Sequence, residues 1–349
     1  MHIVCAMFSR NLGGLEQSLI DYCEALSAQN HSVTAFIYPG ALIEEHLRRR
    51  TASLNVNIVT MRNFGQWDII AVKRFRRKLK DIRPDAIITF GNRAVSMARR
   101  AAKGIAPVIA RTPNYSVKRL IGLDGIFHTT DNLREHIKMM GQPEEKLFHV
   151  PNMVNIPDEH KFSFKPFGKP PVIGTMGRFV KKKGLAEFIH ALSRLRDMKV
   201  RFKAVIGGDG EEKSNLQTLV RNYGLQDHVT FLGWVENKKA FFDSIDIFCL
   251  PSLLEPFGIV LLEAFLHCKP IVTTDSEGPK EIASNGHDAL VVPKGNYIAM
   301  AEALKEMVLD ESRAQTYAIN GLKTIKKRYD TKVVSEKMNE ALKRIIERK

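Results

Sequence analysis

Residues 2–38 read HIVCAMFSRNLGGLEQSLIDYCEALSAQNHSVTAFIY, and this stretch decides the class of fold. It opens with an apolar run typical of a β-strand, His2–Phe8. After two adjacent glycines it continues with Leu15–Ala28, whose apolar residues recur at helical spacing. A second strand-like run, Ser32–Tyr38, follows. A strand, a helix and a strand in this order predict two parallel strands joined by a crossover helix.

The same alternation continues from this unit to residue 292, with one interruption. In the first half, further strands are expected at Val56–Thr60, Asp85–Phe90, Pro107–Ala110, Gly125–His128 and Leu147–Val150. Residues 151–171 interrupt the pattern, because they contain five prolines and show no hydrophobic period. We interpret this segment as a linker. The second half is expected to hold strands at Val172–Gly177, Arg201–Gly207, Val229–Leu232, Asp246–Leu250, Pro270–Thr273 and Ala289–Val292.

These patterns predict an α/β chain of two tandem Rossmann-like, doubly wound domains, residues 1–165 and residues 166–330. The active site is expected in the cleft between them, because such sheets bind ligands outside the carboxyl ends of their strands. Residues 331–349 place their apolar side chains on one face of a helix. We expect this terminal helix to pack back toward the first domain.

The composition is that of a globular protein, with 44% hydrophobic and 26% charged residues. Its four cysteines are far apart and form no CxxC pair, so neither a zinc site nor a redox motif is visible. The N-terminus lacks the basic and apolar regions of a signal peptide, and no apolar run approaches the ~18 residues of a membrane span. We therefore expect a cytoplasmic protein.

Positive charge is concentrated in one segment of the first domain. Residues 48–119 hold 18 lysines and arginines against three acidic residues, an excess equal to the formal net charge of +15 of the whole chain. Such a surface attracts polyanions: nucleic acid, anionic lipid headgroups or phosphorylated glycolipids. Solvated helix faces on a generally basic protein are the alternative interpretation, because charge alone names no partner.

Glycine-rich and cationic stretches follow several of the expected strands. Gly13 and Gly14 precede a helix and let backbone N–H groups approach an anion, although a tight turn accounts for them almost as well. Arg178 and Lys183, in the stretch GRFVKKKG, are spaced to converge on a diphosphate, the arginine as a fork and the lysine as a point charge. A basic surface turn is the alternative. Gly208, in the strand exit IGGDG, permits close approach of the backbone to a nucleotide.

The most specific stretch of the chain is PSLLEPFGIVLLEA. Glu255 lies in its loop, and Phe257, Gly258 and Ile259 lead into a helix whose free N–H groups attract a phosphate. Glu263 lies within that otherwise apolar helix, where an unpaired carboxylate is costly to bury. The loop glutamate suits a sugar hydroxyl and the helical glutamate a ribose diol. Two incidental glutamates would not explain the glycine, the proline and the apolar context together.

In this order and spacing the motifs resemble the family 4 glycosyltransferases, which have the GT-B fold. Glu255 and Glu263 match the E-x7-E signature of that family. The resemblance covers nearly the whole chain and rests also on Gly13-Gly14 with Glu16, Gly177-Arg178 with Lys183-Gly184, Gly207-Gly208-Asp209-Gly210, Phe231-Leu232-Gly233 and Gly278-Pro279-Lys280-Glu281.

This resemblance implies transfer of a hexose from a UDP-sugar or a GDP-sugar with retention of anomeric configuration. It places Arg178 and Lys183 on the donor diphosphate, Glu255 on the donor sugar and Glu263 on the ribose. The backbone of Phe257, Gly258 and Ile259 would line the sugar-phosphate pocket, with Gly13 and Gly14 closing the site from the other domain. The sequence contains no Asp-x-Asp motif suited to a metal on the phosphates, so no metal and no further cofactor is expected. The family favours a front-face displacement in which the leaving phosphate takes the acceptor's proton.

The acceptor side departs from the family pattern. Many relatives carry a histidine at the end of the strand that corresponds to Val108–Ala110, facing the donor sugar, and here Pro113 stands near that position. Arg111 or Asn114 are the candidates to replace it. The surrounding residues resemble bacterial enzymes that decorate lipopolysaccharide core or other envelope glycans. We therefore expect an anionic glycolipid or glycan acceptor and peripheral contact with the inner face of the cytoplasmic membrane, where each cation contributes about 1 kcal/mol.

Other functions remain as alternatives. A nucleotide-sugar 2-epimerase would use the same nucleotide pocket but would consume its substrate without releasing the nucleotide. A basic nucleic-acid-binding protein would explain the charge, but the sequence shows no RNA-binding aromatic signature, zinc finger or helix-turn-helix pattern, so no nucleic-acid partner is expected. A degenerate transferase homologue that only binds is disfavoured by the presence of Arg178, Lys183, Glu255 and Glu263.

Overall fold

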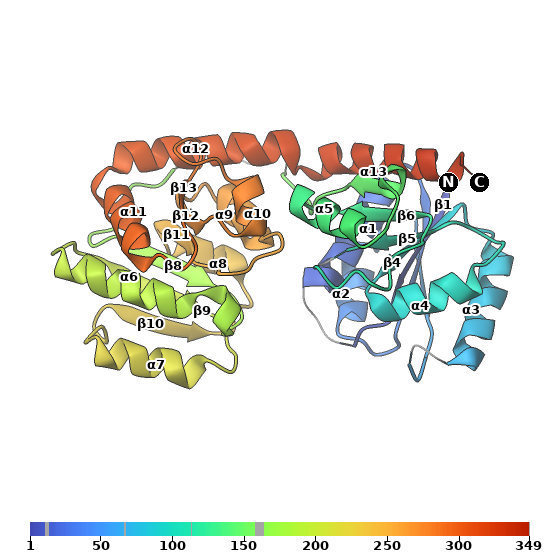
Figure 1. Ribbon diagram of the computed structural model, residues 1–349, viewed down its shortest axis with the longest axis horizontal. Coiled ribbons are helices and arrows are strands. Elements are labelled where there is room, and N and C mark those ends of the chain that lie inside the picture. The colour runs from blue at the N-terminus through green and yellow to red at the C-terminus, as the bar shows by residue number, and fades with distance from the viewer. Residues whose placement is uncertain (11–13, 66–67, 113, 158–163, 349) are drawn as a thin grey trace. The chain divides into compact units, whose positions relative to one another are not determined.

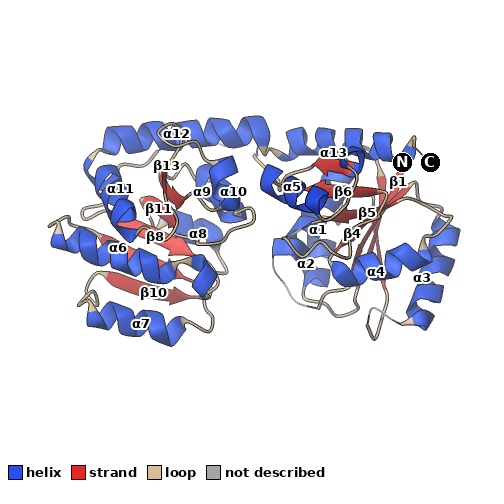
Figure 2. Cartoon of the chain, in the orientation of Figure 1, coloured by secondary structure: helices blue, strands red, loops and turns tan. Residues whose placement is uncertain are grey.

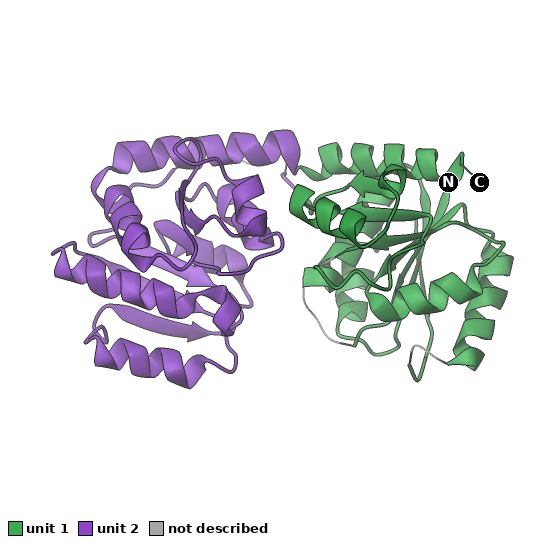
Figure 3. Cartoon of the chain, viewed as in Figure 1, with its two compact units in different colours: residues 1–153, 330–349 green, residues 154–329 purple. Residues whose placement is uncertain are grey.

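The computed structural model describes residues 1–10, 14–65, 68–112, 114–157 and 164–348. The chain forms two compact units: unit 1 comprises Met1–Met153 and Asp330–Lys349, and unit 2 comprises Val154–Tyr329 (Figure 3). The division lies earlier than the predicted boundary at residues 165 and 166. Met153 is buried in a core of unit 1 and Ile156 in a core of unit 2, so the chain is packed on both sides of this division.

In the described residues of unit 1, seven parallel strands form one sheet. They are β1 (His2–Met7), β2 (Ser32–Ile37), β3 (Val56–Thr60), β4 (Ala86–Phe90), β5 (Val108–Arg111), β6 (Gly125–His128) and β7 (Leu147–His149). Their order in the sheet is β3-β2-β1-β4-β5-β6-β7. The chain therefore reverses its direction of winding between β1 and β4, with Ile3 of β1 opposite Ala86 of β4.

Helices cover both faces of this sheet (Figures 1 and 2). They are α1 (Gly14–Ala28), α2 (Ile43–Arg50), α3 (Ile69–Ile82), α4 (Asn92–Ala101), α5 (Asp131–Met139), the short 3-10 turn η1 (Glu144–Lys146) and α13 (Thr331–Ile346). Because side chains alternate along a strand, Ile3 and Cys5 pack in the core with α1, α2 and α13. Val4 and Ala6 pack in the core with α3, α4 and α5 on the other face.

The terminal helix α13, for which packing on the first domain was expected, completes a core of unit 1. Val334, Met338 and Leu342 are fully buried there. Ile345 packs against Gly125 of β6, where an added β-carbon would lie 2.6 Å from the Ile345 Cδ1 atom. The apolar face of α13 is thus fully used for packing within unit 1.

In the described residues of unit 2, six parallel strands form a second sheet. They are β8 (Val172–Met176), β9 (Lys203–Gly207), β10 (Val229–Gly233), β11 (Ile247–Leu250), β12 (Ile271–Thr274) and β13 (Leu290–Val292). Their order is β10-β9-β8-β11-β12-β13, so the winding reverses between β8 and β11.

The helices of unit 2 also cover both faces of its sheet (Figure 2). They are α6 (Leu185–Asp197), α7 (Lys213–Asn222), α8 (Lys238–Asp243), α9 (Ile259–Leu266), α10 (Glu277–Ile282), α11 (Tyr297–Leu309), α12 (Glu311–Arg328) and the 3-10 turn η2 (Lys181–Lys183). Cys249 of β11 packs in the core with α6, α7 and α11, and its neighbour Phe248 packs in the core with α8, α9 and α12.

The prediction of two Rossmann-like, doubly wound α/β domains is confirmed. Each sheet is entirely parallel and has helices on both faces, and each has one point where the order of the strands reverses. In such sheets, ligands bind in the crevice beside the carboxyl ends of the strands at this switch point. That rule directs attention to the loops after β1 and β4 in unit 1, and after β8 and β11 in unit 2.

Candidate functional site

The predicted donor-binding residues of unit 2 lie at the carboxyl edge of its sheet. Arg178 and Lys183 follow β8, Gly208 follows β9, and Glu255 follows β11. β8 and β11 are the neighbours between which the strand order reverses, so this edge is the expected place for a ligand.

The loops after β8 and β11 pack against each other backbone to backbone. The Lys182 carbonyl oxygen accepts hydrogen bonds from the amides of Leu253 (2.9 Å) and Leu254 (3.1 Å). Gly184 ends the η2 turn with φ at +64°, in the left-handed region that favours glycine. A β-carbon at Gly184 would lie 1.9 Å from the carbonyl oxygen of Pro251, so only glycine allows the two loops this approach.

The close approach of these loops brings Lys183 to Glu255, 72 residues further along the chain. The Lys183 Nζ atom donates a hydrogen bond to the Glu255 Oε2 atom, and the two form an ion pair. The Ser252 hydroxyl donates to the same carboxylate oxygen at 3.3 Å. Glu255 is only 8% exposed, so both contacts fix its side chain in a place with little competition from water. The structure thus brings together the lysine that was predicted to bind a phosphate and the carboxylate that was predicted to bind sugar hydroxyls.

A second carboxylate supports this loop from α10. The Glu255 carbonyl oxygen accepts a hydrogen bond from the Gly278 amide at 2.8 Å. Glu277 forms an ion pair with Lys294 at 3.0 Å, and it also accepts a bond from the Glu255 amide at 3.4 Å. Partial burial acts to raise the pKa of Glu277, but backbone hydrogen bonds and Lys294 outweigh it and hold that pKa below its ordinary value. Glu277 therefore stays charged and anchors the backbone of the Glu255 loop.

The start of α9 lies directly after Glu255. Gly258 precedes the helix with φ at +92°, and a β-carbon there would lie 3.3 Å from the Glu255 Cγ atom. Phe257 is buried, and its carbonyl oxygen would lie 2.2 Å from a β-carbon at Gly278. The Leu261 amide donates to the Gly258 carbonyl oxygen at 2.9 Å, whereas the amides of Ile259 and Val260 precede the first intrahelical hydrogen bonds and carry the partial positive charge of the helix. An anion beside Glu255 would meet both these amides and Lys183.

Glu263 lies further along α9 and is already paired. Its carboxylate accepts a hydrogen bond from Lys238 at 2.5 Å, in an ion pair whose lysine side chain is 53% exposed and whose glutamate side chain is 20% exposed. A carboxylate has two oxygens and room for further donors, so a diol could bind Glu263 beside Lys238. The pairing explains how a charged residue is tolerated within an otherwise apolar helix.

The loops after β8 and β9 also fit closely. The Gly177 amide donates to the Gly207 carbonyl oxygen at 2.9 Å. Gly208 has φ at +132°, and a β-carbon there would lie 1.9 Å from the Gly177 carbonyl oxygen. Arg178 follows directly and is exposed, which leaves its guanidinium accessible at the same sheet edge as Lys183. These glycines bring the two strand exits together and carry Arg178 on a fixed turn.

The site residues predicted in unit 1 are not gathered in the same way. Gly13 and Pro113 lie outside the described residues, and Gly14 is the first residue of α1. Arg111 is buried, and its guanidinium donates a hydrogen bond to the Asn152 side chain. Asn114 is exposed and caps its own turn by accepting from the Ser116 amide at 2.9 Å. The two acceptor-side candidates therefore have different surroundings, one in the core and one on the surface.

Sequence analysis missed the residues that hold the donor-side carboxylates in place. They are Ser252 and Lys183 on Glu255, Glu277 and Lys294 behind its loop, and Lys238 on Glu263. The sequence predicts that Lys183 binds a phosphate, and it gives no sign of the ion pair with Glu255. Glu277 directly precedes the Gly-Pro-Lys-Glu stretch that was recognised, so that motif was the available signal. Nothing in the sequence distinguishes Lys238 or Lys294 from the other exposed lysines.

The chain matches two family models. Residues 12–157 match Glycosyltransferase Family 4, and residues 157–324 match Glycosyl transferases group 1. Two relatives come from Rhizobium meliloti: lipopolysaccharide core biosynthesis glycosyltransferase LpsE, 27% identical over 93% of this chain and 94% of LpsE, and its counterpart LpsD, 24% identical over 93% of each. Among solved structures, Anabaena HepE in complex with UDP-glucose superposes with a TM-score of 0.82 at 19% identity, covering 98% of this chain and 99% of HepE.

Together the two models cover residues 12–324, and the E-x7-E stretch lies within the match to Glycosyl transferases group 1. The chain belongs to the family 4 glycosyltransferases and has the GT-B fold. It is a glycosyltransferase. Within the described part of the chain, no helix combines the length and the apolar character that crossing a membrane requires.

Proposed function

We propose that this glycosyltransferase moves a hexose from a UDP-sugar or a GDP-sugar to an anionic, membrane-associated glycan, with lipopolysaccharide core as the acceptor, and that it retains the anomeric configuration without a bound metal. The observation that carries the proposal is the cluster of Lys183, Glu255 and the start of α9 at the switch point of unit 2. The complex of HepE with UDP-glucose supports a nucleotide-sugar donor. The names of LpsE and LpsD support a lipopolysaccharide acceptor.

In this proposal the donor diphosphate lies against Arg178, Lys183 and the first amides of α9. The bond between the anomeric carbon and the phosphate oxygen breaks, and negative charge develops on that oxygen. Cations and amides that are already in place stabilise this charge without having to reorganise. The acceptor hydroxyl oxygen bonds to the anomeric carbon, and its proton goes to the leaving phosphate. Glu255 accepts hydrogen bonds from the sugar hydroxyls and keeps Lys183 in position.

The surface of unit 1 supports contact with an anionic membrane. Ile69 and Ile70 in the first turn of α3 are 64% and 65% exposed, and Phe64, five residues before the helix, is 97% exposed. The exposed face of α3 continues with lysines and arginines, namely Lys73, Arg74, Arg77, Lys78 and Lys80. Apolar side chains beside a row of cations fit the boundary between lipid headgroups and acyl chains. This face would place the enzyme next to a glycolipid acceptor.

The transfer reaction is tested by nucleotide release from a panel of UDP-sugars and GDP-sugars, with and without a crude lipopolysaccharide acceptor. We expect release from one donor to rise with acceptor and to fall by about 10²-fold or more in Glu255→Ala, as for the loss of a preorganised polar group. Glu302→Ala, on the exposed surface of α11, is the matched control and should stay within twofold of wild type. Donor consumption without nucleotide release would indicate an epimerase instead, and no turnover of any donor would refute the proposed activity.

Three further measurements test the finer parts of the proposal. The anomeric signal of the product, read by NMR, should match that of the donor, and an inverted product would contradict retention. A chelator should leave the rate unchanged, whereas a loss of rate that Mg²⁺ restores would show a metal requirement.

Sedimentation with anionic vesicles at moderate salt should be weakened by Ile70→Ser. It should not be weakened by Leu309→Ser, because Leu309 belongs to unit 2, where it is 67% exposed. Equal binding by both variants would remove α3 as the membrane contact.

A further inference from the structure

A cavity of about 450 Å³ lies at the carboxyl edge of the sheet of unit 1. It is lined by Ser9 and Arg10 after β1, by Asn63 and Phe64 after β3, and by Arg93 near the start of α4, which follows β4. β1 and β4 are the strands between which the order of this sheet reverses. The cavity therefore occupies the place where a doubly wound sheet binds its ligand.

The charged side chains that line this cavity are two arginines. Arg10 donates a hydrogen bond to the Tyr38 hydroxyl at 2.6 Å, and its guanidinium lies 4.3 Å from the centre of the Tyr38 ring. Arg93 donates to the Phe8 carbonyl oxygen at 3.1 Å. A guanidinium has five N–H donors, so each arginine uses one of them in the hydrogen bond named above and keeps further donors for a ligand. Two cations that are fixed in this way favour an anion.

Asn63 supplies an independent sign of a ligand. Its side chain is 2% exposed, and among the residues that the structure describes neither its amide nitrogen nor its amide oxygen has a hydrogen-bond partner. Buried polar groups are almost always paired, because an unpaired one keeps the full cost of losing water. An unpaired amide needs a ligand group that both donates and accepts hydrogen bonds, such as a sugar hydroxyl. Two arginines beside it need a negative charge. A sugar that carries a phosphate or a carboxylate meets both requirements.

We propose that this cavity binds an anionic group of the acceptor glycan and selects acceptors by that charge. The proposal rests on the proposed function, because it names what the acceptor of the transferase carries. Arg10 and Arg93 bind the anionic group, and Asn63 bonds a neighbouring hydroxyl. None of these residues belongs to the donor cluster of unit 2.

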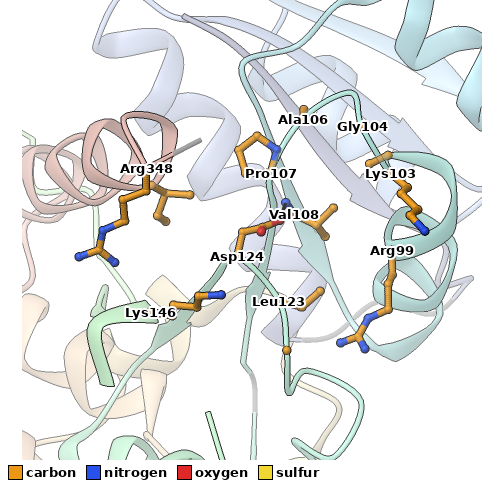
Figure 4. A pocket seen from close by; sticks show the side chains of 13 residues that line it. Arg99, Lys103, Gly104, Ala106, Pro107, Val108, Leu123, Asp124, Lys146 and Arg348 are labelled. Atoms are coloured by element: carbon orange, nitrogen blue, oxygen red, sulfur yellow. Dashed lines mark hydrogen bonds between the residues drawn. The ribbon is translucent and has the colours of Figure 1, made fainter. Parts of the chain in front are cut away.

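A second cavity of unit 1 provides a matched control. It has a volume of about 390 Å³ and lies at the amino ends of β5 and β6, the opposite edge of the same sheet. Figure 4 shows Lys103 and Arg348 on either side of it, with Asp124 between them. The Asp124 carboxylate already accepts a hydrogen bond from the Val108 amide at 2.8 Å. Removing Lys103 and Arg348 takes the same charge from the same unit without touching the proposed acceptor cavity.

The test compares KM values for donor and acceptor in R10Q/R93Q and in K103Q/R348Q. We expect R10Q/R93Q to raise the acceptor KM by about 10-fold to 100-fold, as for the loss of charge-assisted hydrogen bonds, and to leave the donor KM unchanged. K103Q/R348Q should keep both values. With an acceptor stripped of its phosphate and carboxylate groups, wild type should fall to the level of R10Q/R93Q. An equal rise of the acceptor KM in both double variants, or a rise of the donor KM in R10Q/R93Q, would overturn the proposal.

N63L tests the role of Asn63 in acceptor binding with a variant that should be more stable than wild type, so unfolding could not explain a higher acceptor KM. Replacing an unpaired buried amide by an apolar group of similar size should raise the melting temperature while the acceptor KM also rises. A lower melting temperature with an unchanged acceptor KM would mean that Asn63 is only structural and would overturn its part in the cavity. If wild type shows no transfer to any acceptor, the proposed function fails. If it transfers but R10Q/R93Q matches wild type, only this inference fails.

Discussion

Gly184→Ala tests whether the packing of two backbones creates the donor site. The added β-carbon would lie 1.9 Å from the Pro251 carbonyl oxygen, whereas ordinary contacts begin at 3.4 Å, so the loops must separate by about 1.5 Å. That movement breaks the two hydrogen bonds to the Lys182 carbonyl oxygen, each contributing about 1 kcal/mol. The left-handed conformation of residue 184 adds about 1 kcal/mol for alanine. We expect a loss of about 3 kcal/mol in the free energy of unfolding.

The same movement carries Lys183 away from Glu255 and displaces both from the donor. A shift of about 1 Å at reacting groups can cost about 10²-fold in rate, so kcat/KM for the donor should fall by that factor. Gly286→Ala is the control, because Gly286 has φ at +73° and nothing within 4 Å of its added β-carbon. Gly286→Ala places alanine in the same left-handed conformation but causes no steric clash. It should therefore lower the free energy of unfolding by about 1 kcal/mol and leave the activity unchanged. Urea unfolding and nucleotide-release kinetics decide the matter. Equal unfolding midpoints for the two variants, or full activity of Gly184→Ala, would refute the reasoning.

Three further predictions concern charged groups. Glu263→Ala should raise the donor KM by about 10-fold, because a hydrogen bond to the ribose is lost. Lys238→Ala should keep the donor KM within threefold. It should lower the free energy of unfolding by less than about 1 kcal/mol, because the lysine side chain is 53% exposed. Burial and the neighbouring His149 lower the pKa of His128 to about 4. As the pH falls from 6.5 to 4, this histidine is protonated in the unfolded chain but not in the folded one. The free energy of unfolding should therefore fall by about 3 kcal/mol over this range. His128→Phe should abolish that part of the urea-unfolding pH profile, and an unchanged slope would contradict it. Burial raises the pKa of Asp21 to about 6, so its contribution to stability is full below pH 4 and is lost as the pH rises through 6. Asp21→Asn should therefore stabilise the protein by up to about 3 kcal/mol at pH 8 and have no effect at pH 4, and stabilisation that does not depend on pH would contradict this cause.

The central strands could be predicted from the sequence because burial on both faces leaves an apolar run in each short segment, and the partly exposed edge strands β3 and β10 were found from their β-type residues. The expected run at Gly125–His128 is the observed β6, and His2–Phe8 ends one residue after β1. A buried parallel strand reads as a continuous apolar run wherever its neighbours lie in the sequence. The alternation with helices then restricts the topology to a doubly wound sheet, because crossovers are right-handed.

The contacts within the site could not be predicted from the same patterns. Lys183 pairs with Glu255 only because Gly184 allows η2 to approach Pro251, and this contact depends on a distance between two loops far apart in the sequence. The burial of Arg111 could not be predicted from these patterns either, because its partner Asn152 lies 41 residues further along the chain. Sequence motifs indicate which residues belong to the site, but the packing of the loops decides which of these residues contact one another.

The division between the two compact units lies earlier in the chain than the predicted boundary at residues 165 and 166. Prolines mark the absence of regular structure, which is why the sequence pattern suggests a linker there. A segment without helix or strand can still be buried, and Met153 and Ile156 show this on either side of the division. The amide of Val154 donates to the Tyr329 carbonyl oxygen at 2.9 Å, so the two points at which the chain passes between units lie side by side.

The passage of the chain through unit 2 before it returns to unit 1 has a consequence for biosynthesis. On the ribosome, unit 2 is complete once Tyr329 has emerged, whereas unit 1 still lacks α13. Each buried apolar side chain of that helix, such as Met338 or Leu342, contributes about 1.5–3 kcal/mol to the finished core. The first unit to be synthesised is therefore the last to become stable, the reverse of the usual order. Until α13 has emerged, the nascent chain carries an uncovered apolar surface on the sheet of unit 1, the kind of surface that promotes aggregation of folding intermediates.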